Sequence, residues 1–222
     1  MTETCIDKLF RSRRRTIGLE VTRDSELVVR APLGISLQDI QKILFKKASW
    51  ITKKKTLVKQ RRVINQPKEF VSGEIFYYLG KPCRLKLIDT DTIRFTDYLE
   101  FPKIRLLDAR GHLIQWYKNR AHEKIKERVD WYSKKIGLTY SIVKISNAKR
   151  RLGSCSARGN LNFSWRLVMA PLEVIDYVAV HELIHLLVKN HSRNFWNKVK
   201  LVIPEYRERR KWLKNNSQLL DL

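Results

Sequence analysis

The sequence predicts an α+β protein, with a small N-terminal β-sheet and one helix followed by a core of helix, short sheet and further helices. Three observations predict this class. The first half of the 222-residue chain holds short alternating segments separated by turn residues, the second half opens on a long amphipathic pattern, and a more apolar helical segment comes later. We expect two domains, residues 1–104, β-rich with one amphipathic helix, and residues 105–222.

The N-terminal segments predict a hairpin and then a helix. Apolar residues alternate over 17–21 and return at 27–29, after a polar break at 23–25. Pro32 and Gly34 follow the second strand, and Ser36 is a good helix N-cap. The helix that follows has apolar residues at helical spacing, namely Leu37, Ile40, Ile43, Leu44, Ala48 and Ile51.

The rest of the first half predicts a linker and three more strands. Residues 60–70 are mostly polar and contain Pro67, which is typical of a linker or an exposed loop. Strands are predicted at 75–79, 85–88 and 92–95, separated by turn residues at 80–82 and 89–91.

The second half begins with a predicted helix over 111–135, which Gly137 ends because a helix C-terminus often needs a residue at positive φ. Strands are predicted at 140–146 and 161–163. Pro171 and Leu172 then open a long helix, and two further helices follow it.

The charge and composition limit the class of protein. Hydrophobic residues make up 43% of the chain, which excludes a wholly disordered protein. The formal net charge is +24, spread as +10 over residues 1–104 and +14 over residues 105–222. A body this basic attracts polyanions, nucleic acid first among them, although a solvated basic surface without a partner gives the same composition.

Cysteine spacing and hydropathy set the expected location. Cys5, Cys83 and Cys155 are far apart, so neither a disulfide framework nor a cysteine zinc site is predicted. No uninterrupted apolar stretch is long enough to span a bilayer, and residues 1–15 hold no apolar signal core. We expect a cytoplasmic protein without a membrane partner.

The chemistry is concentrated in the motif HELIH at 181–185. On a helix, His181 and His185 lie one turn apart, so both imidazoles emerge on one face and can bind one Zn²⁺. Glu182 lies beside them, where it can take a proton from a metal-activated water. The neighbours are apolar, and two histidines and a glutamate in a buried helix are costly without a partner such as a metal. The alternative is an ordinary helix that happens to carry two histidines.

A catalytic zinc site needs a third protein ligand, and His191 is the preferred candidate. We expect the helix to stop at Asn190, which can adopt a left-handed cap, and a new helix to start after Ser192. That turn would fold His191 back towards the other two histidines. Glu205, on a later helix, is the alternative third ligand.

Several other residues have both a functional and a structural interpretation. Arg151 and the segment 153–155 read either as a strand edge that holds a peptide or, preferably, as a turn in which Gly153 supplies unusual backbone angles. Cys155 lacks a base of its own and is a poor nucleophile candidate. Tyr206 and Arg207 are candidates to stabilise the oxyanion formed during peptide hydrolysis. The alternative is that Tyr206 only packs under the last helix. Residues with an ordinary structural interpretation are His112, His122, Trp196 and Trp212.

The sequence resembles the YgjP-like metallopeptidases, also called the domain of unknown function 45 family, which are related to SprT-like proteases. The resemblance covers most of the chain and includes the Gly80 turn, the segment 151–155, the histidine motif, and the stretches 191–196, 204–206 and 212–213. This chain has Leu152 where the family usually has tryptophan. Metzincins share the ligand spacing, but Val188 replaces their glycine and no methionine follows the motif.

This resemblance implies a zincin-like core in which His181, His185 and His191 bind the metal and Glu182 is catalytic. We therefore predict a zinc-dependent peptidase that acts on protein or peptide substrates. The rival hypothesis is a basic nucleic-acid-binding protein with a structural or vestigial zinc site, and the two can combine in a peptidase acting on DNA-associated proteins. Glu182 favours the enzyme, because a structural zinc site needs no general base.

Overall fold

The computed structural model describes residues 5–22, 24–64 and 68–222, and the chain separates into two compact units. Unit 1 is Met1–Gln66 and unit 2 is Pro67–Leu222. Both units mix helices with small sheets, so the predicted α+β class is confirmed. Within the described ranges, none of the helices has the combination of length and apolarity needed to cross a membrane.

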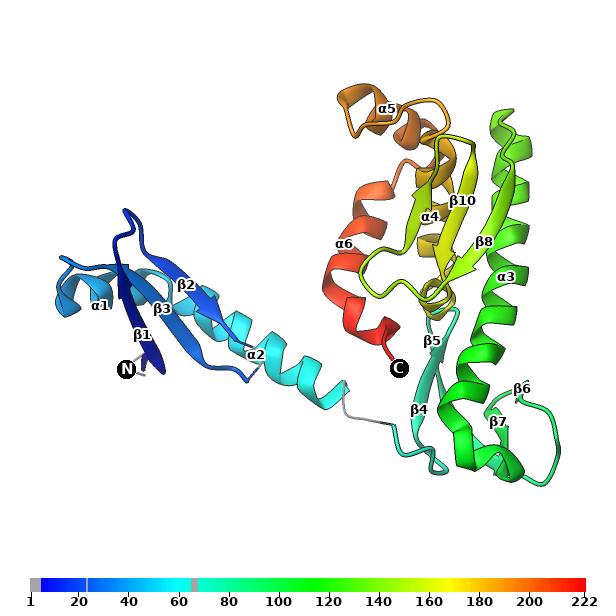
Figure 1. Ribbon diagram of the computed structural model, residues 1–222, viewed down its shortest axis with the longest axis horizontal. Coiled ribbons are helices and arrows are strands. Elements are labelled where there is room, and N and C mark those ends of the chain that lie inside the picture. The colour runs from blue at the N-terminus through cyan, green and yellow to red at the C-terminus, as the bar shows by residue number, and fades with distance from the viewer. Residues whose placement is uncertain (1–4, 23, 65–67) are drawn as a thin grey trace. The chain divides into compact units, whose positions relative to one another are not determined.

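Unit 1 is a three-stranded sheet with two helices (Figure 1). Its elements are β1 Lys8–Ser12, β2 Gly18–Val21, β3 Leu27–Pro32, α1 Leu37–Lys46 and α2 Ala48–Ile64. The predicted hairpin is confirmed as the antiparallel pair β2–β3, while β1, which pairs in parallel with the other edge of β3, was not predicted. Arg23, in the predicted break between these strands, lies outside the described residues.

The helices of unit 1 cover the alternating face of β3. Ser36 caps α1 as predicted, since its Oγ accepts a hydrogen bond from the Asp39 N–H at 3.1 Å. The predicted single helix is interrupted at Lys47, whose N–H bonds back to the carbonyls of α1. The buried core consists of Leu27, Val29, Ala31, Ile40, Leu44 and Ile51.

The predicted linker over 60–70 is wrong in its first part, because α2 continues to Ile64. Residues 65–67 of that prediction lie outside the described residues. A polar sequence favours a linker only where the chain forms no regular structure, and here the helix α2 includes residues 60–64.

The first sheet of unit 2 has the order β4-β5-β7-β6. Its strands are β4 Ile75–Tyr78, β5 Lys81–Ile88, β6 Arg94–Phe95 and β7 Leu99–Pro102. The three predicted strands are present, and β7, which was not predicted, pairs in parallel with β5 and antiparallel with β6. The predicted turn at 80–82 is shorter than expected, because Lys81 and Pro82 already belong to β5.

This sheet belongs to the same compact unit as the helices that follow. The N–H groups of Leu79 and Gly80 donate to the carbonyls of Val168 and Met169 at 2.8 and 3.0 Å. Gly80 has φ +79°, and a Cβ there would lie 2.7 Å from Pro171, so the β4–β5 turn rests directly on the start of α4 (Leu172–Ile184). The boundary between the compact units therefore falls after residue 66, whereas 104/105 was predicted.

The second sheet of unit 2 has the order β8-β10-β9. The helices and strands of this part of the unit, in chain order, are α3 Ala109–Ile136, β8 Ile142–Ser146, β9 Gly153–Cys155, β10 Asn160–Ser164, α4 Leu172–Ile184, α5 Arg193–Val202 and α6 Tyr206–Asn216. Short 3-10 helices lie at Lys103–Asp108, Trp165–Met169 and Ser217–Leu220. Gly137 ends α3 at φ 67°, as predicted. α3 packs along β8 and α4 packs against β9 (Figure 1).

Candidate metal centre

The helix α4 presents the first two histidines of the site. It is apolar around most of its circumference, and nine of its thirteen residues are buried, so its position in the unit is fixed by packing. His181 lies in its last turn and His185 is its C-cap residue, with ordinary helical angles. The two rings are 4.9 Å apart between centroids. The predicted one-turn spacing on one face is therefore present.

The chain turns after α4 by a different route from the predicted one. We expected the helix to end at a left-handed Asn190, but α4 ends at Ile184, and Asn190 is absent from the positive-φ residues in the described part of the chain. The Asn190 side-chain oxygen instead accepts from the Ser192 N–H at 3.2 Å. Ser192 is the N-cap position of α5, as predicted, although its hydroxyl makes no capping bond. The histidine between them is folded back as expected.

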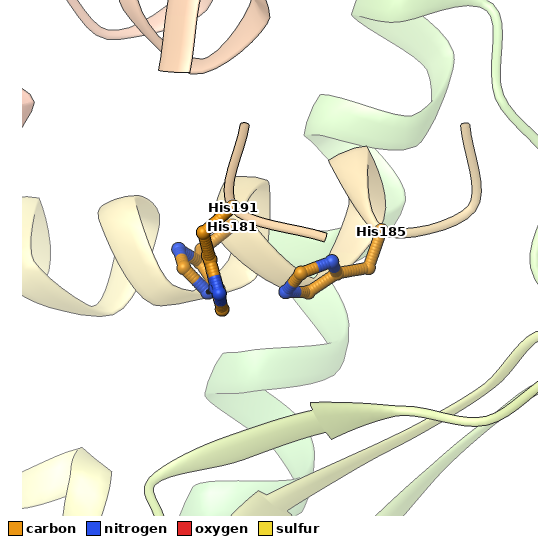
Figure 2. Close-up of side chains that lie close together, drawn as sticks. All are labelled: His181, His185 and His191. Atoms are coloured by element: carbon orange, nitrogen blue, oxygen red, sulfur yellow. Dashed lines mark hydrogen bonds between the residues drawn. The ribbon is translucent and has the colours of Figure 1, made fainter. Parts of the chain in front are cut away.

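Three imidazoles meet at this turn (Figure 2). One nitrogen from each of His181, His185 and His191 lies within 4.8 Å of the others. The Nε2 atoms of His181 and His191 are 3.0 Å apart. Two zinc–nitrogen bonds of about 2.0–2.1 Å at a tetrahedral angle separate their nitrogens by about 3.3 Å. The cluster thus has the size and the donor chemistry for one small cation, and in the described part of the chain no other group of three or more such residues was found.

Glu205, the alternative third ligand, is not a member of this cluster. It is the residue immediately before α6, where its backbone carbonyl accepts from the N–H of Glu208. The choice between His191 and Glu205 depended on tertiary docking, and the described geometry brings the histidine, not the glutamate, to the other two.

Hydrogen bonds outside the cluster orient one of the three rings. The Nδ1 of His185 lies 3.0 Å from the Val188 carbonyl. An Nδ1–H that donates to this carbonyl leaves Nε2 unprotonated and turned to the cluster, a common arrangement at metal sites. By contrast, the Nδ1 of His181 is buried, and among the described residues it has no hydrogen-bond partner.

The surroundings of His181 and His185 favour the neutral imidazole. Burial, together with the neighbouring imidazoles of His185 and His191, lowers the pKa of His181 to about 3. Burial also lowers the pKa of His185. A neutral imidazole is the form that binds a metal, so His181 and His185 do not have to lose a proton first near neutral pH.

Glu182, the residue after His181 on α4, has a buried carboxyl group. It is 5% exposed, and burial raises its pKa to about 7, while the charge of Arg151 acts in the opposite direction. A carboxyl with a pKa near the working pH is suited to both accept and release a proton. Its carboxylate rests on Gly153 of β9, where an added Cβ would lie 2.5 Å from Oε1.

The segment around Gly153 corrects the preferred sequence interpretation. We expected a turn with unusual backbone angles, but Gly153 belongs to the strand β9 and is not among the described glycines with positive φ. Glycine is required here for close approach to Glu182, not for conformational freedom. In the described structure β9 pairs with β10 on one side, which leaves its other side as an edge of the sheet.

The remaining candidates have structural surroundings. Burial raises the pKa of Cys155, the opposite of what activates a thiol nucleophile. Tyr206 is buried, and its hydroxyl accepts from Arg207 Nε at 3.3 Å, so the two bond to each other. His122 is exposed on α3, and His112 lies 3.4 Å from Arg105. Trp196 and Trp212 pack against the hydrophobic core as partly buried residues, as their core-like sequence context indicated, and Trp196 also stacks on His191.

Two solved structures show a partial likeness to this chain. One is the metallopeptidase zymogen abylysin of Pyrococcus abyssi, with 23% identity over 40% of this chain and 93% of that chain, at a TM-score of 0.37. The other is the metallopeptidase zymogen jannalysin of Methanocaldococcus jannaschii, with 26% identity over 40% of this chain and 92% of that chain, also at a TM-score of 0.37. No curated protein matches the sequence.

The family model described as the YgjP-like metallopeptidase domain matches residues 15–216, which is most of the chain and spans both units. The match includes the three histidines and Glu182. On this evidence the chain belongs to the YgjP-like family and is a metallopeptidase.

Proposed function

We propose that this metallopeptidase is a zinc enzyme in which His181, His185 and His191 hold the metal and Glu182 is the general base. The observation that carries the proposal is the meeting of three imidazoles, of which His181 and His185 have a lowered pKa, on the helix that also carries Glu182, whose buried carboxyl has a pKa raised to about 7. Three nitrogen ligands leave one position of a tetrahedral zinc open, which is the arrangement of catalytic rather than structural sites.

The chemistry divides between the metal and the chain. Zinc, when bound, supplies a Lewis acid that polarises a carbonyl and makes water more acidic. Glu182 takes the proton of the attacking water and later delivers it to the nitrogen of the leaving amine, so one carboxyl serves both halves of the hydrolysis. Its burial keeps bulk water away from that proton.

The edge of β9 supports a binding mode for the substrate. An extended peptide can add to an exposed strand edge through its main-chain groups, without a requirement for particular side chains. Gly153 on β9 touches Glu182, so a peptide on this edge passes close to the proposed base. We propose that protein or peptide segments bind here as an additional strand.

Replacing Glu182 by glutamine tests the assignment of the base. We expect Glu182→Gln to bind zinc as the parent does and to lose about 10²–10⁴-fold in turnover of an unstructured peptide substrate, the usual contribution of a general base. Zinc per chain is measured by mass spectrometry beside the peptidase assay. Full activity in the zinc-loaded variant would exclude Glu182 as the base, and loss of zinc would make it a ligand.

A second candidate function is nucleic-acid binding through unit 1. Residues 1–66 carry 16 Lys and Arg against six Asp and Glu. The helix α2 holds six of these cations and no acidic residue. The exposed lysines in the segment 45–54 are Lys46, Lys47, Lys53 and Lys54. The same segment contains Phe45 and Trp50, whose side chains are 79% and 40% exposed. Exposed aromatic rings among cations suit contacts with the bases and phosphates of a nucleic acid.

The double variant Lys53→Glu/Lys54→Glu tests this candidate in the full-length protein. Binding of single-stranded DNA is measured as a function of salt, where each lost phosphate contact lowers the slope of log K against log salt by about 0.7. We expect a slope lower by about one to two units. The matched control is Lys134→Glu/Lys135→Glu, a neighbouring pair on α3 of unit 2. An equal loss in both variants would assign the binding to diffuse charge, and binding that ignores salt would reject it.

A further inference from the structure

The three histidines of the cluster are not held in the same way. His181 and His185 belong to the last turn and cap of a buried helix, and His185 also has a carbonyl partner. His191 is exposed and lies in the loop before α5. Among the described residues, the ring nitrogen of His191 that makes a hydrogen bond is Nε2, towards His181, and none is found for Nδ1. The hydrogen bond that commonly orients a metal-binding histidine is therefore missing from this ring.

Ring stacking takes the place of that hydrogen bond. The imidazole of His191 lies 5.6 Å from the indole of Trp196, with the two planes 24° apart. The contact is local, because Ser192 is the N-cap of α5, His191 precedes it and Trp196 is the fourth residue after it. These are the two positions that pack together in a hydrophobic staple, which fixes the angle at which the chain enters a helix.

Trp196 is in turn held by α6. The Tyr206 ring lies 5.3 Å from the indole with an interplanar angle of 18°. The guanidinium carbon of Arg210 lies 5.0 Å over the same indole, in the range of a cation–π contact. Tyr206 and Arg210 are one helical turn apart, so a single face of α6 makes both contacts.

We propose that Trp196 is a positioning residue that holds His191 in the metal-binding geometry, with Arg210 and Tyr206 of α6 fixing the indole. This inference rests on the proposed function in taking His191 as the third ligand. It assigns a role to the C-terminal helix, which contributes no residue to the histidine cluster. Retention of the metal then depends on the packing of α6 as well as on the ligands.

The experiment measures zinc affinity and zinc release in full-length variants, by competition with a chromophoric chelator. We expect Trp196→Ala to weaken zinc binding by about 10–100-fold, the usual effect of losing a group that orients a ligand. Trp196→Phe, which keeps an aromatic face, restores most of the affinity. The matched control is Trp131→Ala. Trp131 is also a partly exposed tryptophan with cations over its ring, Arg128 and Lys135, but it lies on α3 and makes no contact with His191 among those described. Parent-like affinity in Trp196→Ala would overturn the proposal.

Two further measurements separate a positioning role from a loss of folding. Arg210→Gln changes an exposed side chain and leaves the core intact, and we expect it to speed zinc release several-fold. Zinc should also change the intrinsic fluorescence of the parent, and this change should be absent in Trp196→Phe. An identical fluorescence change in parent and Trp196→Phe would contradict the proposal. If His191→Ala binds zinc as tightly as the parent, His191 is not a ligand and the proposed function fails at this residue. If His191→Ala loses zinc while the Trp196 and Arg210 variants keep it, His191 is a ligand but Trp196 does not position it.

Discussion

The helices α2 and α4 show how differently the two units use ionisable residues. α2 has six cations and no acid, and its described residues are mostly exposed or half-buried. α4 has no Lys or Arg, and its ionisable residues include Glu182 and His181, with His185 at its C-cap and most of the helix buried. An exposed charged side chain costs little folding free energy, and it acts mainly through the long-range electrostatic potential of the surface. A buried ionisable group is costly, so its presence indicates a specific chemical use.

The same contrast holds for the cores. The buried core of unit 1 is a small set of aliphatic side chains between one sheet face and two helices, whereas the core of unit 2 includes aromatic residues from both of its sheets and from α3, α4 and α5. Unit 1 has the greater density of positive charge, +10 on residues 1–66 against +14 on residues 67–222. We expect unit 2 to hold the metal without help from unit 1, and the following predictions test or sharpen that division.

The largest expected effect is on zinc binding when a helix-borne histidine is removed. His185→Ala should lower zinc affinity on the order of 10³-fold, because only two of the three nitrogens remain. Zinc per chain, measured by mass spectrometry, should fall from one to none after dialysis. His122→Ala is the control, since that histidine is exposed on α3 and should leave the zinc content unchanged. Retained zinc in His185→Ala would remove the cluster as the metal site.

Removing a core side chain of unit 1 should destabilise that unit alone. Leu44 is 2% exposed, and Leu44→Ala should cost about 2–5 kcal/mol of the stability of unit 1. Leu37→Ala, on the same helix but 56% exposed, should cost much less. Hydrogen exchange resolves the two units, and zinc affinity should stay at the parent value. A parallel loss of zinc in Leu44→Ala would show that the units depend on each other.

The raised pKa of Glu182 makes a prediction about stability and pH in the presence of a chelator. Because its folded pKa is about 7 instead of 4.5, the folded state holds an extra proton between these values. The cost of the buried carboxylate is therefore absent below pH 4.5, grows between pH 4.5 and 7, and is complete above pH 7. Glu182→Gln should stabilise unit 2 by about 3 kcal/mol at pH 8 and have little effect at pH 4.5, as measured by denaturant unfolding. The same gain at both pH values would contradict the raised pKa.

The smallest of these effects concerns the contact between β9 and α4. Gly153→Ala places a Cβ against the Glu182 carboxylate, and we expect a cost of about 1–3 kcal/mol together with lower peptide turnover. Gly34→Ala is the control, because nothing lies within 4 Å of an added Cβ there. Thermal unfolding and the peptide assay are compared for both variants. A parent-like Gly153→Ala would mean that the carboxylate can move away from β9 freely.

The elements that the sequence predicted well are those with a strong local signal. The hairpin at 17–29, the Ser36 cap, the Gly137 helix end and the helix start at Ser192 all depend on residues within a few positions of each other. The strands β1 and β7 were missed because a short strand without a clear alternating pattern becomes a strand only through its neighbour in the sheet. For the same reason the role of Gly153 was misjudged, since its constraint comes from α4, almost thirty residues later in the chain.

The sequence alone determined the α+β class, the basic charge, and the placement of His181 and His185 on one helix face, because a helix of 3.6 residues per turn fixes which side chains share a face. Only the tertiary structure decided that His191 rather than Glu205 completes the cluster, that Gly153 lies against Glu182, and that α6 reaches His191 through Trp196. These contacts depend on how loops and helices pack against one another, and local periodicity does not encode such distances.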